Sequence, residues 1–336
     1  MLGCHTYQVA IAGSTGAPTI VGDLPTVGLQ WGRIQDETSQ ATVDVGECCD
    51  MLAGVRAIRH SVLILADGQL VWGGPIVRIN WRTGRIVARD VSWWFDRRVI
   101  SQPRSFVGQD LSSIAETLLR DAFAADDPGI LTWLDVQPCG IIGDREYSAD
   151  SIQTVGDAIR ELARTGMDFT VLGWRVLIGP EQTTTRRLGV LTDQHFMVPP
   201  DVIEDGLSLT TRAWVQGSGV LGVAGGTDPY YGLVERSWNE PDIKDVVSAA
   251  AAAQTRVDLL SSSPVFVGDE AGNGFQSVLA PSAPFSLQEL VPGAIIRTAL
   301  TDACRQVAAD LRLHEIQVRV AEDEQVSINL QPLGTV

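Results

Sequence analysis

The sequence of 336 residues is poor in basic residues: 25 arginines and lysines stand against 41 acidic residues, a formal net charge of −16. Proteins that bind nucleic acids or anionic membranes concentrate positive charge. This charge balance therefore argues against general binding of nucleic acids or of anionic membranes. Lys244 is the single lysine, and we attribute this preference for arginine to a GC-rich coding genome.

Long apolar runs are absent too. No window reaches the ~18–20 uninterrupted apolar residues of a membrane-spanning helix, so we expect no membrane insertion. The five cysteines form no CxxC pair, and adjacent cysteines such as Cys48 and Cys49 can hardly bond to each other. Neither a disulfide framework nor a zinc ribbon is indicated, and we expect reduced thiols in a protein assembled in a cytosol. The other cysteines are Cys4, Cys139 and Cys304.

Catalytic and metal-binding patterns are also scarce. The four histidines have no spacing typical of a zinc site, although Cys4–His5, His60 near the Cys48–Cys49 pair, and Asp193–His195 are the nearest groupings. A Cys–His hydrolase whose residues meet only in space stays open. Paired carboxylates such as Asp36–Glu37 lie in predicted turns, where solvent surrounds them. We therefore predict no enzymatic activity, no metal and no cofactor.

One glycine motif suggests a cofactor. Gly217–Gly222 matches G-x-G-x-x-G after a predicted strand. A dinucleotide site needs a helix to begin at this loop, but Val223–Pro229 cannot start one. The motif is therefore interpreted as a loop between strands.

The first hundred residues contain short strands and tight turns. Val62–Ala66 and Gln69–Trp72 flank Asp67–Gly68, a two-residue hairpin turn. Further strand pairs are expected at 76–81 with 85–89 and at 29–34 with 41–45, and Pro75 should lie at a strand start or bulge. Such closely spaced strands predict a closed or nearly closed barrel.

The middle of the chain mixes helices and strands. Helical spacing of apolar residues predicts one helix opened by Asp110 and a second near 152–163, where Thr154–Asp157 forms a loose capping box. Gly166 should cap the second helix, and a strand pair should turn at Gly173–Trp174.

Strands return in the last part of the chain. They are expected at 207–215, 231–235, 277–279, 295–297, 313–320 and 326–330, the last two joined by Ala321–Glu324, with one helix at about 242–260. The fold class is therefore α+β, predominantly β. We expect β-barrel-like domains at 1–100 and 201–336, a small α+β domain at 101–200 between them, and a helical insertion at about 240–262 in the second.

The most distinctive residues lie in and beside the predicted strands of the first hundred residues, in the second predicted helix and the segment after it, and near residue 291. They resemble the minor tail proteins of siphophages that infect actinobacteria, the tail-tip or baseplate hub family. The stretches that carry the resemblance are Trp31–Arg33, Ser39–Ala41, Arg56–His60, Val71–Ile76, Ile86–Arg98, Thr154–Leu162, Thr165–Phe169 and Leu290–Gly293. The structural signature positions are Trp31, Arg33, Trp72, Gly74, Pro75, Asp90, Trp94, Arg97, Pro292 and Gly293.

The resemblance implies a homotrimeric, non-enzymatic ring at the tip of a phage tail, assembled in the host cytoplasm and carried in the virion. Two β-domains per chain give six modules in a trimer, so the ring can join a sixfold tail tube and distal tail protein to a threefold tip fibre or spike. DNA and the tape measure protein would pass through its channel. An acidic lumen would let DNA pass without specific binding.

Two alternatives stay open. One is a tail-tip cell-wall hydrolase. The other is a carbohydrate-binding protein for host attachment that uses exposed tryptophans, although rings such as Trp31, Trp72, Trp81, Trp93, Trp94 and Trp214 more often fill a core or an interface.

Overall fold

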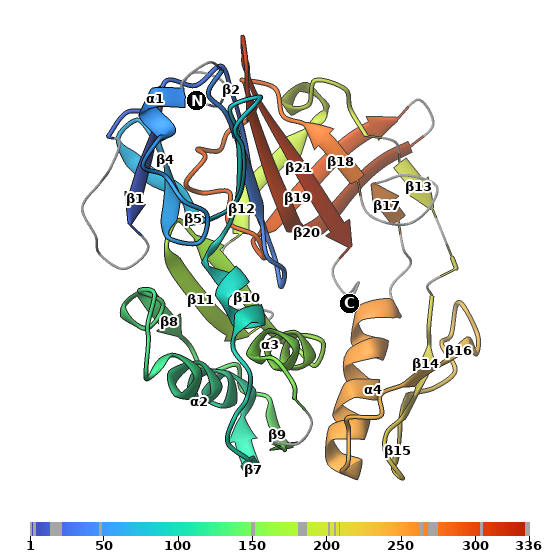
Figure 1. Ribbon diagram of the computed structural model, residues 1–336. Helices are drawn as coiled ribbons and strands as arrows, with labels where there is room; N and C mark the ends of the chain where they lie inside the picture. Colours follow the sequence, from blue (N-terminus) through green and yellow to red (C-terminus); the bar gives the residue numbers. More distant parts are fainter. Residues whose placement is uncertain are drawn as a thin grey trace.

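The computed structural model describes residues 2, 5–13, 22–46, 49–148, 152–180, 187–200, 202–204, 206–207, 209–261, 265–267, 275–302 and 305–332. Three parts lie together (Figure 1): a large curled sheet, an α+β unit beneath one side of it, and a lobe with one long helix beneath the other. Cys4, Cys48 and Cys304 lie outside the described residues, so the predictions made for them stay untested.

The large sheet has eleven strands. Its main path runs β1-β4-β5-β6-β3-β2-β20-β19-β12, and β21 continues from β20 to β18. All neighbours are antiparallel except β12 and β19. The strands are β1 (Tyr7–Gly13), β2 (Gly28–Ile34), β3 (Gln40–Asp44), β4 (His60–Ala66), β5 (Gln69–Asn80), β6 (Arg85–Arg89), β12 (Arg187–Thr192), β18 (Phe275–Val278), β19 (Ile295–Asp302), β20 (Arg305–Val320) and β21 (Glu324–Pro332).

The predicted hairpins are present. Asp67 and Gly68 both have positive φ, and Ala66 pairs with Gln69, so β4 and β5 are joined by the expected two-residue turn. The strand pairs β5–β6, β2–β3 and β20–β21 also form where the sequence places them. Local turn chemistry therefore determines these pairs.

Pro75 was expected at a strand start or a bulge, and it lies inside β5, directly beside a bulge. The first part of β5 pairs with β4, ending at Ser61–Pro75, and the second part pairs with β6 from Ile76 onward, with a register shift between Ile76 and Arg78. Pro75 thus stands where β5 changes partners, next to that irregularity, a kind of position where a sheet tolerates a residue without an N–H.

Strands far apart in the sequence join the two ends of the chain. β2 pairs with β20 from Leu29–Val320 to Ile34–Glu315. Their apolar faces share one core, which includes Trp31 from the first hundred residues and Ile316 from the last. We propose that the chain divides into three parts near residues 100 and 200. The first and third parts are then connected through the β2–β20 pair.

The α+β unit has its own core. Helices α2 (Leu111–Phe123) and α3 (Val155–Ala163) pack against the sheet β10-β11-β8, and β7 pairs with β9. Asp110 and Thr154 cap the two helices as expected, and Gly166 has the positive φ that favours glycine after a helix. The strands are β7 (Arg104–Asp110), β8 (Leu134–Val136), β9 (Ile142–Tyr147), β10 (Met167–Leu172) and β11 (Arg175–Pro180), and a short 3-10 helix, η1 (Val91–Arg97), precedes the unit.

The lobe consists of helix α4 (Val246–Leu260) on the sheet β15-β14-β16 and has a third, small core. Its strands are β14 (Arg212–Gln216), β15 (Leu221–Gly225) and β16 (Glu235–Asn239). The remaining elements are α1 (Cys49–Leu52), η2 (Leu131–Trp133), η4 (Asp193–His195) and the pair β13 (Val202–Glu204) with β17 (Val265–Val267). In the described residues no helix is both long and apolar enough to span a bilayer.

Three predicted boundaries in the lobe are wrong. The strand expected from 207 begins at Arg212. The strand expected at 231–235 begins only at Glu235, because the Asp228 carboxylate accepts the N–H groups of Tyr230 and Tyr231 and holds a turn there. The helix expected from 242 begins at Val246, since Asp245 caps it.

Candidate functional site

Arg33 is the most deeply buried cation among the signature positions. Its side chain projects from β2, and only 4% of the residue is exposed. Nε and Nη2 donate to the carbonyl of Val71 at 3.3 and 2.9 Å, and Nη1 donates to the carbonyls of Leu287 and Leu290 at 3.1 and 3.2 Å. The guanidinium also lies 5.2 Å from the ring centroid of Trp31. One side chain therefore ties β5 and the segment before β19 to β2.

Backbone carbonyls surround this charge. Burial lowers the pKa of Arg33 to about 10, with a smaller opposite contribution from Tyr7. The group still carries its proton at neutral pH, and its donors are directed at carbonyl oxygens. This arrangement is that of a structural clamp.

Asp90 forms a second buried cluster. Its carboxylate accepts the N–H and hydroxyl of Ser39, both at 2.6 Å, and the N–H and hydroxyl of Ser92 at 2.9 and 2.6 Å. Trp72 Nε1 donates to the Ser39 hydroxyl at 3.0 Å. Burial raises the pKa of Asp90, and these hydrogen bonds only partly offset it. Asp90 thereby fixes the start of η1, whose first turn it caps.

Gly74 allows two strands to approach this cluster. A Cβ atom built at Gly74 would lie 1.8 Å from the carbonyl oxygen of Arg89 and 2.7 Å from Cα of Asp90. No side chain fits there without a backbone shift. The glycine and Pro75 therefore shape the corner at which β5 passes beside the end of β6.

Pro292 and Gly293 lie at the turn before β19. Gly293 has φ of +92°, and its N–H donates to the carbonyl of Leu313 at 2.6 Å. Pro292 borders a hollow of about 110 Å³ that also contains Asp168, to which Gln35 Nε2 donates at 2.7 Å. Pro292 is two residues from the Leu290 carbonyl that Arg33 binds, so this turn belongs to the Arg33 clamp.

Trp94 and Arg97 lie on η1 and border an open groove. The groove has a volume of about 860 Å³, and the Arg97 guanidinium stacks 4.5 Å from the ring centroid of Trp93. Trp93 and Trp94 contact each other edge to face at 5.0 Å. The groove is lined by Gln40, Ile58, Val77, Arg78, Val87, Arg89, Trp93, Trp94, Arg97 and Arg98.

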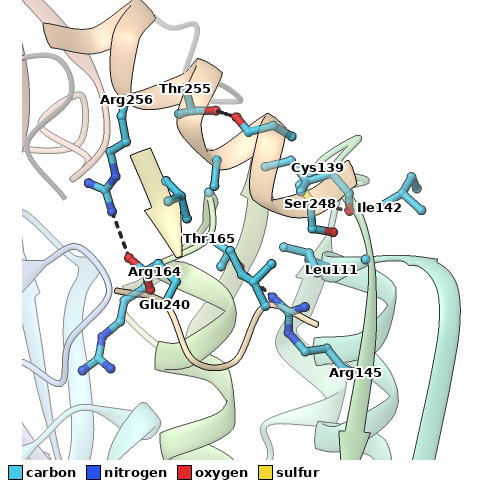
Figure 2. A pocket seen from close by; sticks show the side chains of 17 residues that line it. Leu111, Cys139, Ile142, Arg145, Arg164, Thr165, Glu240, Ser248, Thr255 and Arg256 are labelled. Carbon is cyan, nitrogen blue, oxygen red and sulfur yellow. Dashed lines mark hydrogen bonds and ion pairs between the residues drawn. The ribbon is translucent and has the colours of Figure 1, made fainter. Parts of the chain in front are cut away.

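A separate pocket of about 340 Å³ lies between the α+β unit and the lobe (Figure 2). Its wall is mainly apolar. Arg256 reaches Glu240 at 3.4 Å on one side, and Arg145, which is buried, donates to Thr165 at 3.3 Å on the other. Lys244 approaches Glu146 to 3.8 Å across the same junction. The pocket therefore lies where two parts of the chain with separate cores meet.

The glycine motif forms a hairpin turn. Gly217 donates to the carbonyl of Val220, and β15 begins at Leu221, so the interpretation as a loop between strands is confirmed. A Cβ at Gly222 would lie 2.1 Å from the backbone of Ala249 in α4. The last glycine of the motif therefore permits close packing of helix on strand.

The titratable side chains that the sequence singled out are held by near neighbours. His60 Nδ1 accepts the N–H of Arg56 at 2.9 Å, and His195 Nδ1 accepts the N–H of Thr192 at 3.0 Å. The Cys139 thiol donates to Asp110 at 3.3 Å. No cluster of three or more potential metal ligands occurs within the described residues.

Eight of the ten signature residues lie on β2, on β5, or on η1 and its cap, namely Trp31, Arg33, Trp72, Gly74, Pro75, Asp90, Trp94 and Arg97. Two features were not predicted from the sequence. Arg78 and Arg89 were not expected to join Trp94 and Arg97 in one groove, and the pocket of Figure 2 was not expected at all. The local excess of arginine before residue 100 could have indicated the groove. The pocket depends on how two separate parts pack, for which no local pattern exists.

No family model matches the chain, and no curated protein matches it. Solved structures do match, and the three described here are distant in sequence. The tail protein of Neisseria meningitidis MC58 is 13% identical with a TM-score of 0.61, and 98% of each chain is covered. The 43 kDa tail protein of prophage MuSo2 from Shewanella oneidensis is 10% identical with a TM-score of 0.65, covering 98% of this chain and 99% of that one. Prophage tail protein gp18 from Listeria monocytogenes EGD-e is 11% identical with a TM-score of 0.61, covering 96% and 94%. The chain thus shares its whole fold with proteins described as tail proteins.

Proposed function

We propose that the chain is a structural, non-enzymatic tail-tip hub of a long-tailed bacteriophage. The observation that carries this proposal is the end-to-end likeness of fold to three tail proteins, which leaves almost no part of either chain unmatched. A shared fold alone does not define a function, but here three separate tail proteins share it over their whole length.

The hub is proposed to be a homotrimeric ring. Each chain supplies β-structure from both ends, joined through β2 and β20, so that three chains present six β-modules around an axis. The path of the large sheet ends at β1 and β12. Exposed sheet edges invite pairing, and a closed ring would cover them.

The ring is proposed to connect the tail tube and distal tail protein to the tip fibre or spike, around a channel for DNA and the tape measure protein. The net charge of −16 per chain supports passage of DNA without binding, provided that acidic side chains line the channel. A siphovirus of actinobacteria as the source, and the virion tail tip as the location, belong to the same proposal.

Native mass spectrometry of the purified protein tests the oligomer. Three chains of 36.2 kDa give a complex of about 109 kDa. A protein that stays monomeric at every concentration would contradict the ring. A zymogram on host peptidoglycan tests the non-enzymatic role, since a cleared band from the purified protein would contradict it.

A further inference from the structure

Positive charge gathers in one part of this acidic chain. Between residues 51 and 100 there are eight arginines and three aspartates, whereas the rest of the chain has 17 basic and 38 acidic residues. One of the three aspartates, Asp90, is buried, so it does not neutralise the surface. The groove beside η1 lies in this segment and contains four of these arginines.

The groove combines these charges with apolar surface. Arg78 and Arg97 are exposed, and Trp93, Trp94, Val77 and Val87 are each half-buried. Arg98 is paired with Asp126 at 2.8 Å. Within the described part of the chain, by contrast, no ion pair is formed by Arg78, Arg89 or Arg97. Guanidinium groups next to indole rings are the combination that recurs at the energetic centre of protein interfaces.

Rigid elements hold this surface in place. Asp90 caps η1, and the β5–β6 hairpin supplies Arg78 and Arg89. Because η1 on one side of the groove and the β5–β6 hairpin on the other are held in place, the groove needs little rearrangement to receive a partner. Preorganisation of this kind lowers the entropy cost of binding.

We propose that this groove, which we call the arginine groove, receives an acidic surface of a second copy of the chain. The inference rests on the ring proposed above and names the contact that closes it. Copies with a charge of −16 repel each other at long range, so their association needs local charges of opposite sign. The arginine groove supplies one side of that contact, and the acidic remainder of the chain supplies the other. The same net charge disfavours a phosphate backbone as the occupant.

The scarcity of lysine provides a sharp test. Lys244 is the only lysine, so a carbodiimide has few side-chain amines to couple. In the variant Arg97→Lys, a carboxylate that touches the groove would be activated by the reagent and attacked by the new amine. An amide bond forms, and the carbodiimide leaves as its urea. The control is Arg82→Lys, which places an amine on the exposed β5–β6 turn outside the groove.

We expect an amide-linked dimer from Arg97→Lys, with little from Arg82→Lys or the wild type, and peptide mass spectrometry should identify the acidic residue. The double reversal Arg78→Glu/Arg97→Glu should weaken association about tenfold or more by sedimentation, while Arg82→Glu leaves it unchanged. Circular dichroism melting that matches the wild type shows that the variants fold.

Three results would overturn the inference. If the wild type forms a trimer but Arg97→Lys gives no intermolecular amide and the double reversal still assembles, the groove is not the contact, although the ring stands. If the wild type is always monomeric, the ring and the groove contact both fail. If a labelled DNA oligonucleotide binds the wild type and not the double reversal, the groove belongs to a phosphate backbone.

Discussion

Arg33 Nη1 donates a hydrogen bond to the carbonyl of Leu290 at 3.2 Å, across a sequence separation of 257 residues. The same guanidinium binds Val71 in β5. The two ends of the chain are therefore joined twice, by the β2–β20 ladder and by one buried cation whose donors all face carbonyl groups. In the proposed hub, this clamp would keep the two ends of each chain in fixed register.

Arg33→Met should be strongly destabilising. The substitution retains apolar bulk but leaves three buried carbonyls without their donor, so we expect the free energy of unfolding to fall by about 3–5 kcal/mol. Urea denaturation measures the loss. Arg82→Met, on an exposed turn, is the control and should change stability by less than about 0.5 kcal/mol. Equal stability of both variants would show that the clamp contributes nothing.

Gly74→Ala tests the close approach beside β6. The added methyl group would lie 1.8 Å from the Arg89 carbonyl oxygen, so the backbone must move, at a cost of about 1–3 kcal/mol or more. Gly54→Ala is the matched control, because its Cβ meets nothing within 4 Å. Thermal melting should separate the two variants by several degrees. A Gly74→Ala protein that melts like the wild type would contradict this packing.

Asp110 gives a pH-dependent prediction. Partial burial alone would raise its pKa, but hydrogen bonds from Gly140, Cys139 and Ser112 lower it below the ordinary 3.8. A lowered carboxyl pKa stabilises the fold above the unfolded value and loses that contribution as pH falls through the folded value. Asp110→Asn keeps an oxygen that can cap α2 and removes only the charge, so it should cost about 0.3–1 kcal/mol at pH 7. This cost should shrink as the pH falls below about 4 and vanish below the folded pKa of Asp110. Urea denaturation at several pH values measures the free energy of unfolding of the variant and the wild type. A difference between them that does not change with pH would contradict a contribution from the Asp110 charge.

Gly222→Ala should loosen the lobe without disturbing the large sheet. Its Cβ would overlap the backbone of Ala249, so α4 must move away from β15. Hydrogen exchange should become faster in α4 and stay unchanged in β20. Gly226→Ala, with open space around its Cβ, is the control and should exchange like the wild type. Uniform loss of protection across both parts would mean that the lobe is not a separate packing unit.

Local structure could be predicted well from the sequence. The Asp67–Gly68 turn, the Asp110 and Thr154 caps and the β20–β21 hairpin depend on neighbouring residues, and all form as expected. By contrast, the β2–β20 and β12–β19 pairs join residues far apart in the sequence. Apolar alternation shows that a strand has a buried face, but it does not identify its neighbour, so these pairs could not be predicted.

Part of the candidate site could likewise be predicted from the sequence, and part could not. Trp31, Trp72 and Asp90 were singled out as parts of one pattern, and they do lie in buried positions. The clamp formed by Arg33 could not be predicted, because it required knowing that the carbonyls of Leu287 and Leu290 come back to β2. The arginine groove also depends on tertiary folding, because η1 must pack beside β5 and β6 before the four guanidinium groups share one surface.

Electron microscopy of the purified oligomer tests the central claim most directly. We predict a closed annulus with threefold symmetry, in which the curled sheets of three chains form six β-modules around an open axis. A reconstruction in which the copies do not encircle an axis, or assemble as an open filament, would contradict the account.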